Sequence, residues 1–214
     1  MKSYLSGSAS ALTILVIPLF FIRLLLLPVF PAIEYRMPGF PEDSYGFTNE
    51  ERVKWATYGM EYLLNDAGPE YLGDLRFDDG SPVFNEREVQ HMLDVKIVVG
   101  QVLVVFRISL ALLVGLGLFA WRRGWVDSYS QGISRGGWIL LIILLTLGLV
   151  AVTSFWQFFA AFHAIFFEGD SWLFAYSDTL IRLYPIRFWQ DVIIYIMGGS
   201  ALASGLLGWF LGKK

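Results

Sequence analysis

Two histidines, His91 and His163, are the side chains best suited to chemistry in this sequence of 214 residues, which contains no cysteine. Histidine exchanges a proton near neutral pH, so each is a candidate general acid or base. The lack of cysteine excludes disulfides, thiolate–metal sites and a cysteine nucleophile. The histidines and scattered acids match no strong metal-ligand spacing, and the sequence lacks the common nucleotide and zinc-protease motifs. We therefore expect no metal and no other cofactor.

Each histidine has polar neighbours. His91 and Asp94 share a helix face at i, i+3, where a carboxylate can orient an imidazole and stabilise its protonated form. On spacing alone, a solvated helix end explains this pair better. His163 opens the aromatic stretch 162–189, which also contains Asp178 and Arg182. An aromatic belt at the level of lipid headgroups explains the rings. The interleaved charges suggest a polar site roofed by aromatic side chains.

Arg23 and Arg107 lie inside apolar stretches. A guanidinium in a membrane span is costly and usually faces a cavity or a partner. Either arginine could contact a lipid ester or stabilise an oxyanion formed from it. The alternatives are snorkelling, or pairing with backbone carbonyls, Asp94 or Asp191.

The elements that must position these side chains are membrane helices. The chain is 56% hydrophobic and only 16% charged, and a helix needs roughly 20 apolar residues to cross a bilayer. The first apolar run is too long for a cleaved signal peptide and has no suitable cleavage site after it. We predict an all-α membrane protein with about four transmembrane helices, at 11–30, 97–121, 137–155 and 192–211.

The positive charges predict the orientation. With both termini in the cytoplasm, one set of basic residues lies inside: Lys2, Arg122, Arg123, Arg135, Lys213 and Lys214. Segments 31–96 and 156–191 then face outward. His91 precedes the second span by six residues and His163 follows the third, so both lie at the outer interface. This shared depth is a reason to consider them together, although two unrelated interfacial histidines would explain it equally well.

The outer segment 31–96 has the pattern of a small folded subdomain. Thr48 and Glu51 form a capping-box pattern that opens a helix ending near Asn65. Asp79-Gly80 indicates a hairpin, weakened by Pro82, and 85–88 is a second helix-start signal. We predict an α+β extracytoplasmic subdomain. The chain then divides into an N-terminal helix at 1–30, this subdomain at 31–96, and a three-helix membrane region at 97–214 with an aromatic outer loop at 156–191.

Two motifs resemble a known family, the lipoprotein intramolecular transacylases of bacterial membranes. The first is Glu88-x-x-His91-Met92-x-Asp94-Val95-Lys96. The second is Phe162-His163-x-x-Phe166-Phe167, followed by Asp170-x-Trp172-x-Phe174 and by Asp178-x-Leu180-Ile181-x-Leu183-x-Pro185-x-x-Phe188. The resemblance covers essentially the whole chain.

The resemblance implies an enzyme of the cell membrane that acts on diacylated bacterial lipoproteins among membrane lipids. It would move the sn-2 acyl chain of the diacylglyceryl-cysteine to the α-amine of that cysteine, giving a lyso-form lipoprotein. His91 and His163 map onto the family's two histidines. We take His163 as the general base and His91 as its partner, although the reverse is nearly as well supported.

Asp94 and Asp178 are supporting candidates in this assignment, and Arg182 is a weaker one. The alternative function is a non-enzymatic, lipid-binding membrane scaffold or assembly subunit with structural histidines. The net charge of −3 indicates no nucleic-acid partner, and four spans without repeats argue against a transporter.

Overall fold

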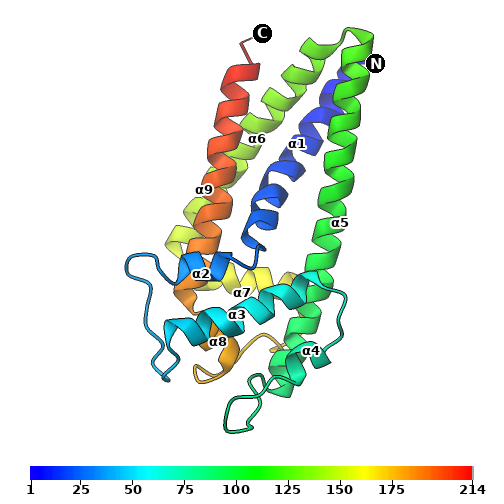
Figure 1. Ribbon diagram of the computed structural model, residues 1–214. Helices are drawn as coiled ribbons and strands as arrows, with labels where there is room; N and C mark the ends of the chain where they lie inside the picture. Colours follow the sequence, from blue (N-terminus) through cyan, green and yellow to red (C-terminus); the bar gives the residue numbers. More distant parts are fainter. Residues whose placement is uncertain (214) are drawn as a thin grey trace. The chain divides into compact units, whose positions relative to one another are not determined.

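The computed structural model describes residues 1–213, and Figure 1 shows that this part of the chain is helical. The helices, in chain order, are α1 (Lys2–Leu25), α2 (Phe30–Glu34), α3 (Asn49–Leu64), α4 (Glu70–Gly73), α5 (Glu86–Arg123), α6 (Val126–Thr153), α7 (Phe155–Phe166), α8 (Thr179–Leu183) and α9 (Ile186–Leu211).

Four of these helices, α1, α5, α6 and α9, are long and apolar enough to cross a membrane. They overlap the four spans expected from hydropathy, with shifted ends. The first helix ends at Leu25, before Pro28, because the residue preceding a proline is disfavoured in the helical conformation. The apolar run after the third span is a separate helix, α7, because Ser154 adopts a non-helical backbone (φ −154°, ψ 80°).

The chain divides into two compact units. The first comprises Met1–Leu24, Val102–Phe155 and residues 193–213, and it contains most of the membrane helices. Small residues let its helices approach closely, as is usual between membrane helices. Gly136 on α6 lies so near α1 that a Cβ atom there would overlap the carbonyl oxygen of Ser10. Ser134 donates a hydrogen bond of 2.9 Å to the carbonyl of Gly208 on α9.

The second unit comprises Leu25–Gln101 and Trp156–Val192, and both histidines belong to it. Its longest separate helix, α3, begins with the expected capping box between Thr48 and Glu51. Helix α3 contacts α2, α4 and α8. Tyrosine hydroxyls tie these pieces together, since Tyr184 donates to the carbonyl of Ala56 at 3.1 Å and Tyr35 to that of Leu183 at 2.8 Å.

The prediction of an α+β subdomain is wrong. Within residues 1–213 the expected hairpin is reduced to one isolated bridge between Arg76 and Pro82. The turn itself forms, with Gly80 in the left-handed region at φ 84°. Pro82 has no N–H to donate to a strand ladder, so pairing stops after the bridge. The outer segment is therefore helices and loops.

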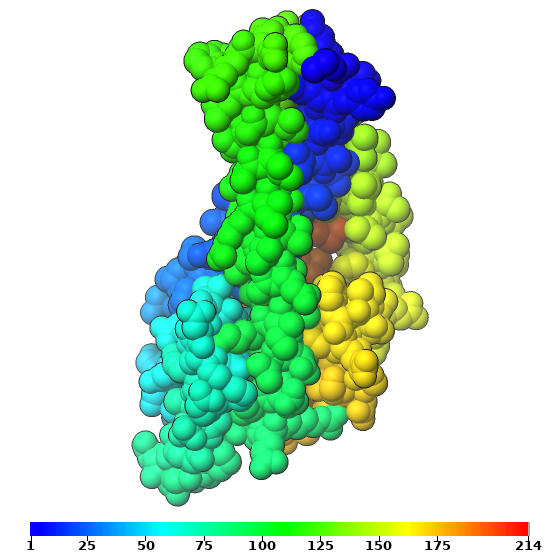
Figure 2. All heavy atoms as spheres, turned by 90° about the vertical axis from the view of Figure 1, so that its right-hand side faces the viewer, coloured from blue at the N-terminus to red at the C-terminus, as the bar shows by residue number. Residues whose placement is uncertain are grey.

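Within the second unit, the chain around residues 156–175 packs against the first turns of α5. Figure 2 shows this segment in yellow beside the green surface of α5. Ring contacts between His91 on α5 and Phe167 and Phe174 join the two segments.

Candidate active site

His163 lies on α7, a helix in which seven of the twelve residues are aromatic or histidine. Its Nδ1 atom is 2.8 Å from the carbonyl oxygen of Phe159, one turn earlier. A carbonyl oxygen can only accept a hydrogen bond, so Nδ1 carries the proton and Nε2 keeps the lone pair. The backbone of α7 thereby selects the tautomer whose Nε2 atom can accept a proton.

Aromatic rings surround the imidazole of His163. Ring centroids lie 4.1 Å away for Phe159, 4.6 Å for Trp172 and 5.6 Å for Phe167, and the histidine is only 7% exposed. This burial lowers the pKa of His163 below its ordinary value because a positive charge loses its hydration there; the Phe159 carbonyl opposes the shift only in part. His163 is therefore held as the neutral base at pH 7.

His91 lies in the second turn of α5, six residues before the apolar part of that helix begins. Its ring centroid is 5.0 Å from that of Phe167 and 5.3 Å from that of Phe174. Its Nδ1 atom is buried without a hydrogen-bond partner among the described residues. A second imidazole thus faces the same aromatic segment as the first.

Phe167 contacts both histidines, which places the two imidazoles in one aromatic cluster. The separation of the two rings is bounded by the sum of their distances to Phe167, 5.0 and 5.6 Å. Two histidines that are 72 positions apart in sequence therefore lie in one cluster. One of them, His163, is held in the tautomer that can accept a proton at Nε2, and His91 is a second imidazole in the same cluster.

The first turn of α5 is held by a reciprocal cap that also reaches α8. The Asn85 side chain accepts from the Glu88 N–H at 3.0 Å, and the Glu88 carboxylate accepts from the Asn85 N–H at 2.8 Å. This confirms the second predicted helix start. The other Glu88 oxygen accepts from the backbone N–H of Leu180 at 2.6 Å. Glu88, 1% exposed, therefore fixes the start of α5 to the start of α8.

Comparison with known proteins identifies the family of this chain. The family described as "Lipoprotein intramolecular transacylase Lit" matches residues 7–189. This chain belongs to that family. A protein of Aquifex aeolicus (strain VF5), described as uncharacterised, is 36% identical over 184 residues, which cover 82% of this chain and 81% of its own.

The crystal structure of the membrane-integral lipoprotein intramolecular transacylase Lit from Bacillus cereus has the same fold. The two are 19% identical with a TM-score of 0.61, over 99% of this chain and 93% of that one. A variant of the B. cereus protein with a histidine replaced by alanine gives a TM-score of 0.55 at 18% identity, over 99% and 91% of the two chains. Together with the four apolar helices, these likenesses identify a multi-pass membrane protein of the Lit family.

The three supporting candidates, Asp94, Asp178 and Arg182, lie in the same unit as the histidines, but their side chains bind residues other than the histidines. Asp94 accepts a hydrogen bond from Gln90 at 3.2 Å. Asp178 precedes α8 and accepts from the backbone N–H of Ala175 at 2.9 Å, which closes the turn before that helix. These contacts are those of residues that shape the site, and a role in catalysis stays a prediction for each.

Arg182 forms an ion pair with Asp43, Nη2 to Oδ2 at 3.0 Å, and its guanidinium lies 3.4 Å from the centroid of the Phe47 ring. Burial by itself would raise the pKa of Asp43, but hydrogen bonds from Arg182 and from the Phe47 N–H outweigh it and lower that pKa. Arg182 thus attaches the loop before α3 to α8. Its part in catalysis also stays a prediction.

Arg23 and Arg107 belong to the first unit, on α1 and α5. Asp191, one partner suggested for them, forms an ion pair with Arg187 instead. Their proposed contact with an ester or oxyanion stays a prediction.

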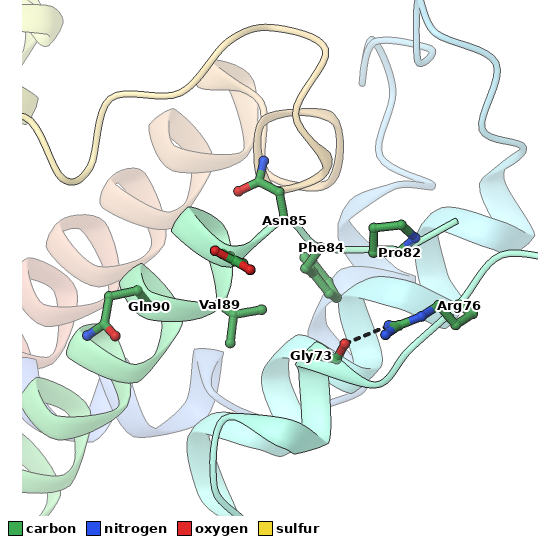
Figure 3. A pocket seen from close by; sticks show the side chains of 8 residues that line it. Gly73, Arg76, Pro82, Phe84, Asn85, Val89 and Gln90 are labelled. Carbon is green, nitrogen blue, oxygen red and sulfur yellow. Dashed lines mark hydrogen bonds between the residues drawn. The ribbon is translucent and has the colours of Figure 1, made fainter. Parts of the chain in front are cut away.

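A cavity of about 480 Å³ opens beside the start of α5, and Figure 3 shows the side chains around it. Its lining does not include either histidine and consists of Gly73, Arg76, Pro82, Phe84, Asn85, Glu86, Val89 and Gln90. The two candidate catalytic histidines therefore lie within the aromatic cluster and do not line this cavity. Among residues 1–213, no three His, Asp or Glu side chains are grouped so as to hold a metal ion.

Sequence reasoning did not single out Arg87, Glu88, Phe167 and Trp172 as site residues, although all four contact the histidines or hold the segment that does. A signal existed for Glu88, because the pattern Asn85-x-x-Glu88 marks a cap one turn before His91. Phe167 and Trp172 stood in the motif that resembles the family, but nothing in the residue pattern itself separated them from an interfacial belt.

Proposed function

We propose that this protein transfers an acyl chain within one lipoprotein, from the sn-2 position of the diacylglyceryl-cysteine to the α-amine of the same cysteine. Family membership supports the substrate class. The observation that carries the proposal is the hydrogen bond between His163 Nδ1 and the Phe159 carbonyl, because it leaves Nε2 as a base in a cluster that also contains His91.

The reaction requires one proton to move between two substrate atoms. The α-amine attacks in its neutral form, which its ammonium ion, with a pKa of about 8, reaches by losing one proton to water. As the amine nitrogen bonds to the ester carbonyl carbon, Nε2 of His163 accepts one of its two remaining protons, and the bond from this carbon to the glycerol oxygen breaks. The leaving oxygen gains that proton, so the exchange balances without a co-reactant. We assign His91 to stabilise the developing charge or to deliver that proton.

Positioning supplies much of the acceleration in this scheme. The nucleophile and the ester belong to the same molecule, so no second substrate has to be bound and oriented. No nucleophilic side chain of the protein is needed, which accords with a chain without cysteine.

The low exposure of His163 favours transfer over hydrolysis. Rings of Phe159 and Trp172 lie against the imidazole, and a site that excludes water leaves the amine as the available nucleophile. We place this site at the extracytoplasmic interface of the bacterial cell membrane, with both termini in the cytoplasm, because the lipid ester of the substrate lies at that depth.

The test is to produce the protein in bacteria whose lipoproteins are diacylated with a free α-amine. Intramolecular transfer leaves the lipoprotein mass unchanged, so tandem mass spectrometry of the N-terminal lipopeptide must locate the acyl chains. We expect one chain on the α-nitrogen and one on glycerol. A lipoprotein with both chains still on glycerol, in membranes shown to contain the protein, would refute the proposal.

A second measurement tests whether transfer stays within one molecule. Purified protein is given a mixture of two lipopeptides, one with isotopically heavy acyl chains and a heavy peptide, the other fully light. We expect no product that combines a heavy peptide with a light acyl chain. Mixed products would indicate transfer between molecules.

A further inference from the structure

The segment between α7 and α8, residues 167–178, covers both histidines and is called the aromatic loop below. Its Trp172 ring lies 4.6 Å from that of His163, its Phe174 ring 5.3 Å from that of His91, and its Phe167 ring contacts both. The loop therefore supplies much of the cover over the two imidazoles.

Arg87, in the first turn of α5, holds the outer part of this loop. Its Nη2 atom donates to the carbonyl oxygen of Asp170 at 2.5 Å and lies 3.6 Å from the Asp170 carboxylate. Its guanidinium also lies 5.6 Å from the centroid of the Phe174 ring. The side chains of Arg87 and Asp170 are 51% and 83% exposed, and exposed ion pairs of this kind are weak.

The next residue, Glu88, holds the other end of the loop. Its buried carboxylate accepts from the Leu180 N–H, and the neighbouring Thr179 hydroxyl donates to the Val83 carbonyl at 2.5 Å. Both contacts are buried, so breaking them would leave polar groups without partners. Two consecutive residues of α5 thus bind the two ends of the aromatic loop. Glu88 holds the end next to α8 by a buried hydrogen bond, and Arg87 holds the outer part by a weaker, exposed contact.

An opening is required if the histidines act on a lipid ester. His163 is only 7% exposed, so a carbonyl group cannot come within bonding distance of its ring unless part of the cover moves. Of the two segments that cover His163, α7 is a regular helix, whereas the outer part of the aromatic loop is attached to α5 through the exposed Arg87–Asp170 contact.

We propose that the aromatic loop is a lid that hinges at the Glu88 end and is latched by Arg87. Release of the contact between Arg87 and Asp170 swings Trp172 and Phe174 away and admits the ester, and closure excludes water before the amine attacks. Arg87 is a positioning residue in this scheme. The purpose of the lid rests on the proposed function, but its movement can be measured without acyl transfer.

Chemical modification of the histidines measures the movement directly. His91 and His163 are the only histidines in the chain, so their reaction with diethylpyrocarbonate can be followed by mass spectrometry of two peptides. With Arg87→Gln we expect both to react roughly three- to tenfold faster than in the wild type, as loss of a weak latch implies.

The matched control is Arg76→Gln. Arg76 is also an exposed arginine of this unit, but its guanidinium donates to the carbonyls of Gly73 and Leu75 instead of to the aromatic loop. We expect wild-type reactivity from it. Equal reactivity of the histidines in Arg87→Gln and in the wild type would overturn the latch.

A reversible cross-link tests whether opening is required for function. Since the chain has no cysteine, Arg87→Cys combined with Asp170→Cys places the only two thiols across the latch. A thiol-cleavable bis-methanethiosulfonate should join them, with a mass shift that confirms the bridge. Relative to the same protein before cross-linking, we expect both histidine modification and acyl transfer to fall at least about tenfold and to return on reduction. The single-cysteine variants lack the latch but cannot be bridged, so treatment with the reagent should not slow them.

Bridged protein with full histidine reactivity and full transfer would contradict the lid, and so would failure of the two cysteines to cross-link. If wild-type protein transfers no acyl chain, the proposed function fails, and the modification rates still decide whether the loop opens.

Discussion

Replacing Glu88 by glutamine should destabilise the protein more than the same change two residues earlier. Each Glu88 carboxylate oxygen accepts one backbone N–H, from Asn85 at 2.8 Å and from Leu180 at 2.6 Å. Glutamine presents an oxygen to one of these donors and an NH₂ group to the other. One buried N–H then loses its acceptor, which costs about 1–3 kcal/mol.

Glu86→Gln is the matched control because Glu86 is an exposed acid in the same helical turn. Both variants replace a carboxyl group by an amide in the first turn of α5, near the helix N-terminus. The difference between them isolates the two hydrogen bonds that Glu88 accepts, a buried one from Leu180 and a partly buried one from Asn85.

The assay is thermal unfolding of the purified protein in detergent, followed by tryptophan fluorescence. For a domain of this size, 1 kcal/mol corresponds to about 2–4 °C in Tm. We expect Glu88→Gln to melt a few to about 10 °C below Glu86→Gln. Equal melting temperatures would refute the reasoning, since the buried cap would then contribute nothing to stability.

Four further predictions concern catalysis, pH and packing. His163→Asn keeps a donor for the Phe159 carbonyl but lacks a base, so acyl transfer measured by tandem mass spectrometry should fall about 10²- to 10⁴-fold with an unchanged Tm. Because burial lowers the pKa of His163, the pH dependence of its modification by diethylpyrocarbonate, which reacts with the neutral imidazole, should have its midpoint below 6.5, and a midpoint above 6.5 would contradict this. The pKa of Asp43 is lowered in the folded state, so its stabilisation is present above its unfolded pKa of about 4 and is lost as the pH falls below that value; Asp43→Asn should flatten the acid end of a plot of Tm against pH. Gly136→Ala should cost about 1–3 kcal/mol of unfolding free energy because its Cβ would overlap the α1 backbone, whereas Gly198→Ala, where the space is open, should not.

Hydropathy determined the membrane helices because each one satisfies its backbone hydrogen bonds internally and needs only a sufficient apolar length. Local capping patterns likewise predicted the starts of α3 and α5, since a cap involves residues three positions apart. The hairpin prediction failed because strand pairing depends on donors that Pro82 cannot supply.

The contacts around the two histidines were beyond reach of sequence reasoning. Spacing placed His91 and His163 at one membrane depth, but a shared depth leaves their lateral separation open. Three contacts of the site join residues more than 70 positions apart. The two histidines both contact Phe167, Glu88 accepts a buried hydrogen bond from Leu180, and Arg87 donates an exposed one to Asp170. Such contacts form only when the packing of α5, α7 and α8 brings the segments together, because no local rule of sequence specifies which distant side chains will touch.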